Sequence, residues 1–106
     1  MVYVVDIDQT ICYSKNKDYK NAVPDFDRIE KINKLYDNGN KIIYFTARGM
    51  GTFDGNQLLA IQKYYKMTLD QLANWNVKFH QLILGKPAGD LYIDDKGVKD
   101  SDFFGD

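Results

Sequence analysis

Asp6 and Asp8 stand two residues apart, directly after the short apolar run Val2–Val5. On a continuing strand this spacing turns both carboxylates to the same side. Two anions at such close range repel each other, so ionising both requires a cation between them or a proton kept on one. The pair therefore indicates either a cation site or a carboxylate that works beside a carboxylic acid. A single Asp at a strand end usually only forms a turn, so the other polar residues must decide.

Further polar residues follow apolar runs or sharp turns later in the chain. They are Thr46 after Ile42–Phe45, Lys86 in the turn-forming segment Gly85–Gly89, and Asp94 with Asp95 after Leu91–Ile93. If the apolar runs are parallel strands, their carboxyl ends meet at one edge of a sheet, where ligands bind. We therefore expect these side chains to gather near the two aspartates of the first run.

The gathered groups have the chemistry of phosphoryl transfer. Asp6 is a carboxylate nucleophile that can attack phosphorus and form an aspartyl-phosphate. Asp8 can protonate the leaving oxygen and then activate the water that hydrolyses the intermediate. Thr46 offers a hydroxyl, and Lys86 a positive charge, to the phosphoryl oxygens. We therefore predict that these four residues are catalytic.

Asp94 and Asp95 supply the remaining carboxylates of an all-oxygen metal site. Mg²⁺ is the hard cation that prefers such ligands, and it keeps several waters. A cation here also neutralises charge between a carboxylate nucleophile and a phosphate. The sequence therefore predicts a Mg²⁺ cofactor, with Asp6, Asp8, Asp94 and Asp95 as its metal-binding residues.

The apolar spacing predicts the elements that position these groups. Between the first two apolar runs, a helix begins after the N-cap Asp25 and ends at Gly39, so that the two runs become parallel strands of a right-handed unit. The polar, turn-rich segment Ile11–Pro24 predicts a short flap. The apolar runs Val2–Val5 and Ile42–Phe45 predict two buried strands. A third strand is expected over Val77–Leu84 and a short fourth one over Leu91–Ile93.

The segment between the second and third predicted strands is expected to be helical after a glycine-rich loop. One stretch covers about Gln57–Tyr65, and a second begins at Thr68, which forms a capping box with Gln71. One kinked helix and two separate helices both fit this pattern. The tail Lys96–Asp106 is polar apart from Phe103 and Phe104, which we expect to pack back on the body.

Composition and charge limit the classes of function. The chain has 106 residues and is expected to form a single domain, residues 1–106. A net charge of -1 gives no electrostatic footprint for nucleic acid or an anionic membrane surface. No membrane span or signal-peptide pattern is visible, so we expect a cytoplasmic protein. The single cysteine, Cys12, excludes an intramolecular disulfide, and nothing nearby activates its thiol toward His80.

The four motifs, taken in order, resemble those of the haloacid dehalogenase (HAD) superfamily of phosphatases. They are hhhh-Asp6-x-Asp8-x-Thr10, hhhh-Thr46, Lys86 and hhh-Asp94-Asp95, where h is an apolar residue. The resemblance implies an α/β fold with a three-layer Rossmann-like core and a parallel sheet of about four strands in the order 4-1-2-3. It also implies Asp6 as nucleophile, Asp8 as general acid/base, and Mg²⁺ bound by Asp6, the Asp8 backbone carbonyl and the Asp94/Asp95 pair. Gln9 departs from the family pattern, which usually has Gly or Asn there.

The chain has no room for the cap domain that many members of the superfamily carry. The segments Thr46–Met50, Leu84–Pro87 and Tyr92–Asp95 are similar to small HAD phosphatases associated with capsular polysaccharide biosynthesis. This resemblance implies a sugar phosphate or a related small metabolite as the substrate. A capless site is open, so we expect a homo-oligomer to narrow it.

Other residues and functions remain open. Thr10, Arg48 and Asn56 are candidate substrate-binding residues, although Arg48 could instead form a surface salt bridge and Asn56 could cap a helix. A receiver-type signalling domain is disfavoured, because the third predicted strand, Val77–Leu84, holds no Asp to be phosphorylated. Two alternatives fit the same residues: a phosphoprotein phosphatase, and a non-catalytic module that binds phosphate or Mg²⁺.

Overall fold

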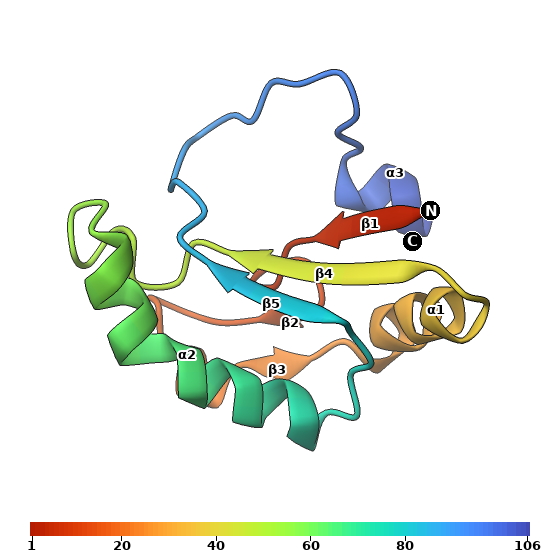
Figure 1. Ribbon diagram of the computed structural model, residues 1–106, viewed down its shortest axis with the longest axis horizontal. Helices are drawn as coiled ribbons and strands as arrows, with labels where there is room; N and C mark the ends of the chain where they lie inside the picture. The colour runs from red at the N-terminus through yellow and green to blue at the C-terminus, as the bar shows by residue number, and fades with distance from the viewer.

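Three parallel strands form the main sheet of the protein, in the order β1-β4-β5 (Figure 1). They are β1 (Val2–Val5), β4 (Lys41–Thr46) and β5 (Gln81–Leu84). This computed structural model describes all of residues 1–106. A second, antiparallel sheet pairs β2 (Cys12–Tyr13) with β3 (Val23–Pro24), and the 3-10 helix η1 (Tyr19–Asn21) lies between them in the chain. The expected α/β class is confirmed, and β2, η1 and β3 together form the predicted flap.

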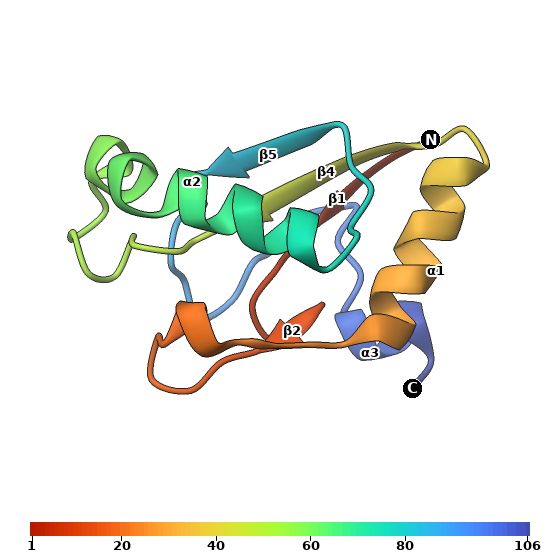
Figure 2. The same cartoon turned by 90° about the horizontal axis from the view of Figure 1, so that it is seen from below.

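The helices all cover the same face of the main sheet. They are α1 (Phe26–Asp37), α2 (Gln57–Asn74) and α3 (Asp100–Phe104). Figure 2 shows α1 and α2 on one side of the three strands and no element on the other side. The core lies on the covered face, where Ile42, Tyr44 and Leu82 are buried. The opposite, bare face exposes apolar side chains, among them Val2, Val4 and Ile83. The expected three-layer core is therefore not present, because helices cover one face only.

The expected fourth strand does not form. Leu91 and Ile93 are 80% and 90% exposed, and Pro87–Lys99 runs as an irregular arm from the end of β5 to α3 (Figure 1). A crossover between parallel strands needs about a dozen residues, whereas only Gly85–Asp90 separates β5 from the predicted strand. The order 4-1-2-3 is therefore not seen within the chain, and the outer edge of β1 pairs with no strand.

The remaining element predictions differ in detail. Asp25 is the N-cap of α1, as predicted, and its side chain accepts a hydrogen bond from the Arg28 backbone amide. The third strand starts at Gln81 rather than Val77. His80, just before it, stacks on Tyr36 with ring centroids 4.6 Å apart and has no catalytic neighbour.

The two predicted helical stretches form a single continuous helix, α2, rather than two separate helices. Thr68 lies buried in its interior, so the predicted capping box is wrong. The N-cap of α2 is Asn56, whose side chain accepts a hydrogen bond from the Leu59 amide. None of the helices combines the length and the apolar content that crossing a bilayer requires.

The C-terminal tail packs back on the body, as predicted, through a buried arginine. Arg28 is 6% exposed, and it donates hydrogen bonds to Asp100 at 2.7 Å and to Asp106 at 2.5 and 2.8 Å. Its guanidinium also lies 4.5 Å from the centre of the Phe104 ring. These contacts tie α3 to α1, and so hold the far end of the arm in place.

Acid is expected to release this tether. Hydrogen bonds from Arg28 lower the carboxyl pKa of Asp100 and of Asp106 below their ordinary value of 3.8. A carboxyl with a lowered pKa in the folded state contributes stability above its unfolded pKa, and this is lost as the pH falls through the lowered value. We therefore expect the free energy of unfolding to decline below about pH 3.8, and to decline less in Arg28→Met. Urea denaturation between pH 7 and pH 2.5 measures the free energy of unfolding of the wild type and of Arg28→Met. An equal decline with falling pH in the two proteins would contradict the role given to the Arg28 ion pairs.

Tyr44 is expected to be a weak point of the core. Its side chain is fully buried, and its hydroxyl is the one buried side-chain polar atom without a hydrogen-bond partner. An unpaired buried hydroxyl is costly, so Tyr44→Phe is expected to raise the free energy of unfolding by about 1 kcal/mol. Tyr13→Phe is the control, because the Tyr13 hydroxyl donates to Asp25 at 2.9 Å and its removal brings no gain. Equal effects of the two substitutions in urea denaturation would refute this reasoning.

Candidate active site

Asp6 and Lys86 meet at the carboxyl edge of the main sheet, as the strand pattern predicts. Asp6 follows β1 directly, and the backbone amide of Lys86 donates to the carbonyl of Thr46 at the end of β4. This hydrogen bond holds the Lys86 backbone at the carboxyl end of β4, and the Lys86 Nζ atom lies 3.5 Å from Asp6 Oδ1. The edge therefore presents a carboxylate beside an ammonium group.

Asp6 is held at both oxygens and is still accessible. Its side chain is 35% exposed, Lys86 faces Oδ1, and the Thr10 hydroxyl donates to Oδ2 at 3.1 Å. Burial raises the pKa of the Asp6 carboxyl above its ordinary value, while the charge of Lys86 and hydrogen bonds from Ile7 and Thr10 oppose that shift. Thr10 thus contacts the proposed nucleophile directly. The arrangement suits a carboxylate that must keep one orientation while a ligand approaches.

Asp8 is held by a buried arginine. Arg48 Nε donates to Asp8 Oδ2 and Arg48 Nη2 to Asp8 Oδ1, both at 2.9 Å. The Arg48 side chain is 0% exposed, so the interpretation of Arg48 as a surface salt bridge is wrong. Two parallel hydrogen bonds of this kind fix both the position and the plane of the carboxylate.

The other side of the Arg48 guanidinium joins α2 and the flap. Nη1 donates to Thr68 Oγ1 at 3.1 Å and to Gln71 Oε1 at 2.7 Å. The guanidinium lies 4.9 Å from the centre of the Tyr19 ring, and Gln71 Nε2 donates to the Tyr19 carbonyl at 2.7 Å. Arg48 is therefore the centre of a buried cluster that connects Asp8, α2 and the flap. The sequence did not reveal this cluster, although the spacing of Thr68 and Gln71 places both on one face of a helix.

Thr46 and Asn56 use their side chains locally. Thr46 is 1% exposed, and its hydroxyl accepts a hydrogen bond from the Arg48 backbone amide at 3.2 Å. Asn56 caps α2, which is the alternative that its sequence position left open. Cys12 lies in the core, where burial and the neighbouring Asp8 raise the pKa of its thiol to about 12. This thiol is therefore not a nucleophile at neutral pH.

Gln9 has a left-handed backbone conformation, in the turn between Asp8 and the flap. Its φ is 61°, in the left-handed region that favours Gly or Asn. The Gln9 amide donates to the Cys12 carbonyl at 2.8 Å, and its side-chain oxygen accepts from the Ser14 amide at 2.9 Å. These bonds keep the turn between Asp8 and the flap in place with a glutamine at this position.

Asp94 and Asp95 lie on the arm, away from the other carboxylates. Asp94 Oδ1 accepts hydrogen bonds from the amides of Lys96 and Gly97, at 2.7 and 2.5 Å, and so caps its own turn. No group of three His, Cys, Asp or Glu side chains lies close enough to hold a metal ion. The predicted set of four metal-binding aspartates is therefore not assembled within one chain, and its residues do not fit Mg²⁺ in this arrangement.

The arm starts in a closed turn beside Lys86. The Tyr92 hydroxyl donates to the Pro87 carbonyl at 2.6 Å and accepts from the Gly89 amide at 3.0 Å. Lys86 Nζ also lies 4.4 Å from the centre of the Tyr92 ring. This turn folds the first part of the arm back on itself.

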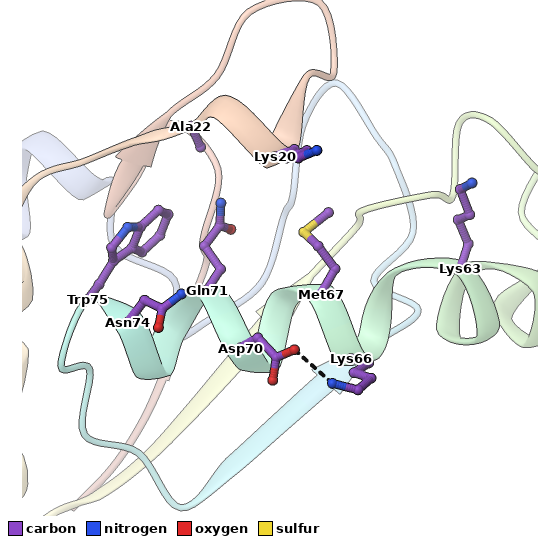
Figure 3. A pocket seen from close by; sticks show the side chains of 9 residues that line it. All are labelled: Lys20, Ala22, Lys63, Lys66, Met67, Asp70, Gln71, Asn74 and Trp75. Carbon is purple, nitrogen blue, oxygen red and sulfur yellow. Dashed lines mark hydrogen bonds and ion pairs between the residues drawn. The ribbon is translucent and has the colours of Figure 1, made fainter.

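A groove of the protein lies apart from Asp6. It has a volume of about 590 Å³ and lies between the flap and α2 (Figure 3). None of the predicted site residues lines it. Gln71 and Met67, which both accept hydrogen bonds from Arg48, are lining residues of the groove. The remaining lining residues are Lys20, Ala22, Lys63, Lys66, Asp70, Asn74 and Trp75.

Comparisons with known proteins give a relative of known structure. No protein-family model and no curated protein matches the chain. The crystal structure of a structural-genomics target from Vibrio cholerae superposes with a TM-score of 0.89 at 30% sequence identity, over 97% of this chain and 86% of that one. The chain belongs to the same family as this Vibrio cholerae protein. The fold described here is therefore shared by the two proteins.

Proposed function

We propose that the protein is a capless HAD-type phosphatase that hydrolyses a phosphomonoester through an aspartyl-phosphate on Asp6. The observation that carries this proposal is the placement of Asp6, which is accessible at the carboxyl end of β1 and held between Thr10 and Lys86. A sugar phosphate or a related small metabolite of polysaccharide biosynthesis is the proposed substrate, on the resemblance of the sequence to that group of phosphatases.

The residues of the chain divide the chemistry between them. Lys86 binds the phosphoryl oxygens and so holds phosphorus in front of Asp6. A carboxylate oxygen of Asp6 attacks phosphorus, and the bond to the leaving oxygen breaks as Asp8 gives that oxygen a proton. Water then attacks the same phosphorus, Asp8 takes a proton from it, and inorganic phosphate leaves with Asp6 restored.

Asp8 keeps the capacity for this role although Arg48 binds both of its oxygens. Each carboxylate oxygen has two lone pairs, and Arg48 occupies one on each. Asp8 can therefore accept a proton on a remaining lone pair without leaving Arg48.

Mg²⁺ is the proposed cofactor of this phosphatase. The residues that would hold it are Asp6, the backbone carbonyl of Asp8, and Asp94 with Asp95, and the cation would neutralise charge between the nucleophile and phosphate. Because the arm keeps Asp94 and Asp95 away, the set requires Leu91–Ile93 to take the place of the fourth strand, next to a β1 strand. In the order 4-1-2-3, this is the place of the fourth strand at the outer edge of the first.

The test is phosphate release from a panel of phosphorylated sugars, nucleotides and peptides, assayed with Mg²⁺ and with EDTA. We expect release that needs Mg²⁺ and is fastest with a sugar phosphate. Highest rates with phosphopeptides would move the proposal to a phosphoprotein phosphatase. Mg²⁺ binding by a folded protein with no release from any substrate would overturn the proposal in favour of a non-catalytic module.

Lys86→Met is expected to lower kcat/KM by about 10²- to 10³-fold, because it removes a positive charge aimed at the phosphoryl oxygens. Lys86 is the ammonium group within 4 Å of Asp6. Lys34→Met is the matched control, since Lys34 lies exposed on α1 and pairs only with Glu30. Steady-state kinetics on the best substrate measure both variants, and an equal loss in the two would rule out a specific role for Lys86.

A further inference from the structure

We propose that two copies of the chain exchange their arms, so that Asp94 and Asp95 of one copy complete the site at Asp6 of the other. In this arrangement Leu91–Ile93 pairs with the free outer edge of β1 in the second copy. The role given to the two aspartates rests on the proposed function. The pairing of the strands rests on the fold alone.

The first argument is the length of the connection. For Leu91–Ile93 to run parallel to β1 of its own chain, the residues Gly85–Asp90 would have to return from the carboxyl edge of the sheet to the opposite edge. Parallel crossovers take about a dozen residues, and this one is far shorter. The turn that the Tyr92 hydroxyl closes with Pro87 and Gly89 shortens its reach further. A second copy removes the constraint, because its β1 can approach from outside.

The second argument is the apolar surface that one chain leaves uncovered at two places. The arm exposes Leu91, Ile93 and Val98, and β1 exposes Val2 and Val4. A free strand edge beside exposed apolar side chains is a template for pairing with another chain. One chain therefore carries both an unpaired edge and an unpaired strand-forming segment, and these complement each other between copies.

The third argument is that both ends of the arm are fixed. Lys86 is held at Thr46 and Asp6, and α3 is held by Arg28. The arm between them protrudes as a loop, and its one hydrogen bond to the rest of the chain lies at its end, where the Lys99 carbonyl accepts from the Phe103 amide at 3.0 Å. A two-fold axis that brings one arm to the β1 edge of a partner brings the partner's arm to the first β1 edge. Both sites are then completed by the same contact, and the outer edge of β1 is paired in both copies.

Engineered disulfides test the exchange without any assay of activity. Val4→Cys is combined with Leu91→Cys in one variant and with Ile93→Cys in another, and the buried Cys12 is left in place. We expect a dimeric mass for the unmodified protein by light scattering, and a disulfide-linked dimer on oxidation of at least one variant. Leu58→Cys with Leu91→Cys is the control for random collision, since Leu58 is more exposed than Val4 but lies on α2. A monomeric mass, a disulfide closed within one chain, or a covalent dimer no more abundant than in the control would overturn the exchange.

Complementation tests whether the exchanged aspartates serve the site. Asp6→Asn and the double variant Asp94→Asn, Asp95→Asn are each expected to be inactive. Unfolded together and refolded as an equal mixture, they form mixed dimers in which one site has an intact Asp6 and an intact arm. About a quarter of the wild-type activity is then expected to return. No recovery beyond the separate variants would show that each arm serves its own chain. If the wild type releases no phosphate, the proposed function fails, and the disulfide result still decides the exchange.

Discussion

Asp6→Asn is expected to abolish phosphate release, with kcat lower by about 10³-fold or more. The amide is nearly the same size as the carboxylate, but it has no anionic oxygen with which to attack phosphorus. Thr10 donates a hydrogen bond to one Asp6 oxygen and Lys86 lies beside the other, so the amide can occupy the same place. Steady-state phosphate release and rapid-quench detection of a phosphorylated enzyme measure the effect. Retention of even a tenth of the activity would exclude Asp6 as the nucleophile.

The same substitution is expected to leave the protein at least as stable as the wild type. Burial raises the pKa of the Asp6 carboxyl, so its ionised form at neutral pH carries a desolvation penalty that an amide does not. Loss of activity with an unchanged or higher unfolding midpoint would separate chemistry from folding. Asp54→Asn is the matched carboxylate-to-amide control, because Asp54 is exposed in the loop before α2. This control is expected to keep wild-type activity.

Arg48→Met is expected to lower the free energy of unfolding by about 3 to 5 kcal/mol, the range found when one partner of a buried ion pair is removed. Four hydrogen bonds to oxygen atoms of three residues are lost at once, and Asp8 loses its buried partner. Methionine fills much of the volume, so the loss reports the polar contacts rather than a cavity. Urea denaturation at neutral pH gives the value.

Two further variants distinguish the buried charge from general damage to the core. Arg28→Met removes an arginine of similar burial, but its partners Asp100 and Asp106 are partly exposed and can return to water, so a smaller loss is expected. Adding Asp8→Asn to Arg48→Met removes the orphaned charge and is expected to recover part of the stability. A double variant no more stable than Arg48→Met would show that the ion pair is not the source of the loss.

The elements that local sequence determines were predictable. β1, β4 and α1 follow from short apolar runs, from helical spacing and from the N-cap Asp25, all of which act within a few residues. The interior of α2 could not be predicted in this way, because Thr68 and Gln71 form the sequence pattern of a capping box. Their side chains bind Arg48, a residue twenty positions earlier in the chain, and this tertiary contact outweighs the local preference.

The candidate site shows the same division. Asp6, Thr46 and Lys86 come together because each lies at or just after the carboxyl end of a strand of one parallel sheet, which is a consequence of chain order. The pairing of Arg48 with Asp8 depends on side chains that meet only in the folded core. Asp94 and Asp95 stay apart because the connection from β5 is too short, a limit of chain geometry that counting apolar runs does not detect.

The uncovered edge of β1 also affects the chain during its synthesis. Val2–Val5 contains no charge, proline or bulge, which are the means by which proteins keep edge strands from pairing with other chains. Because synthesis proceeds from the N-terminus, this strand leaves the ribosome on the order of seconds before Leu91–Ile93 exists. During that interval β4 can cover only one of its two edges. Nascent chains on one messenger RNA therefore meet while these β1 edges are unpaired, which favours assembly between neighbouring chains on the same polysome. For the same reason, expression at a high level is expected to promote aggregation.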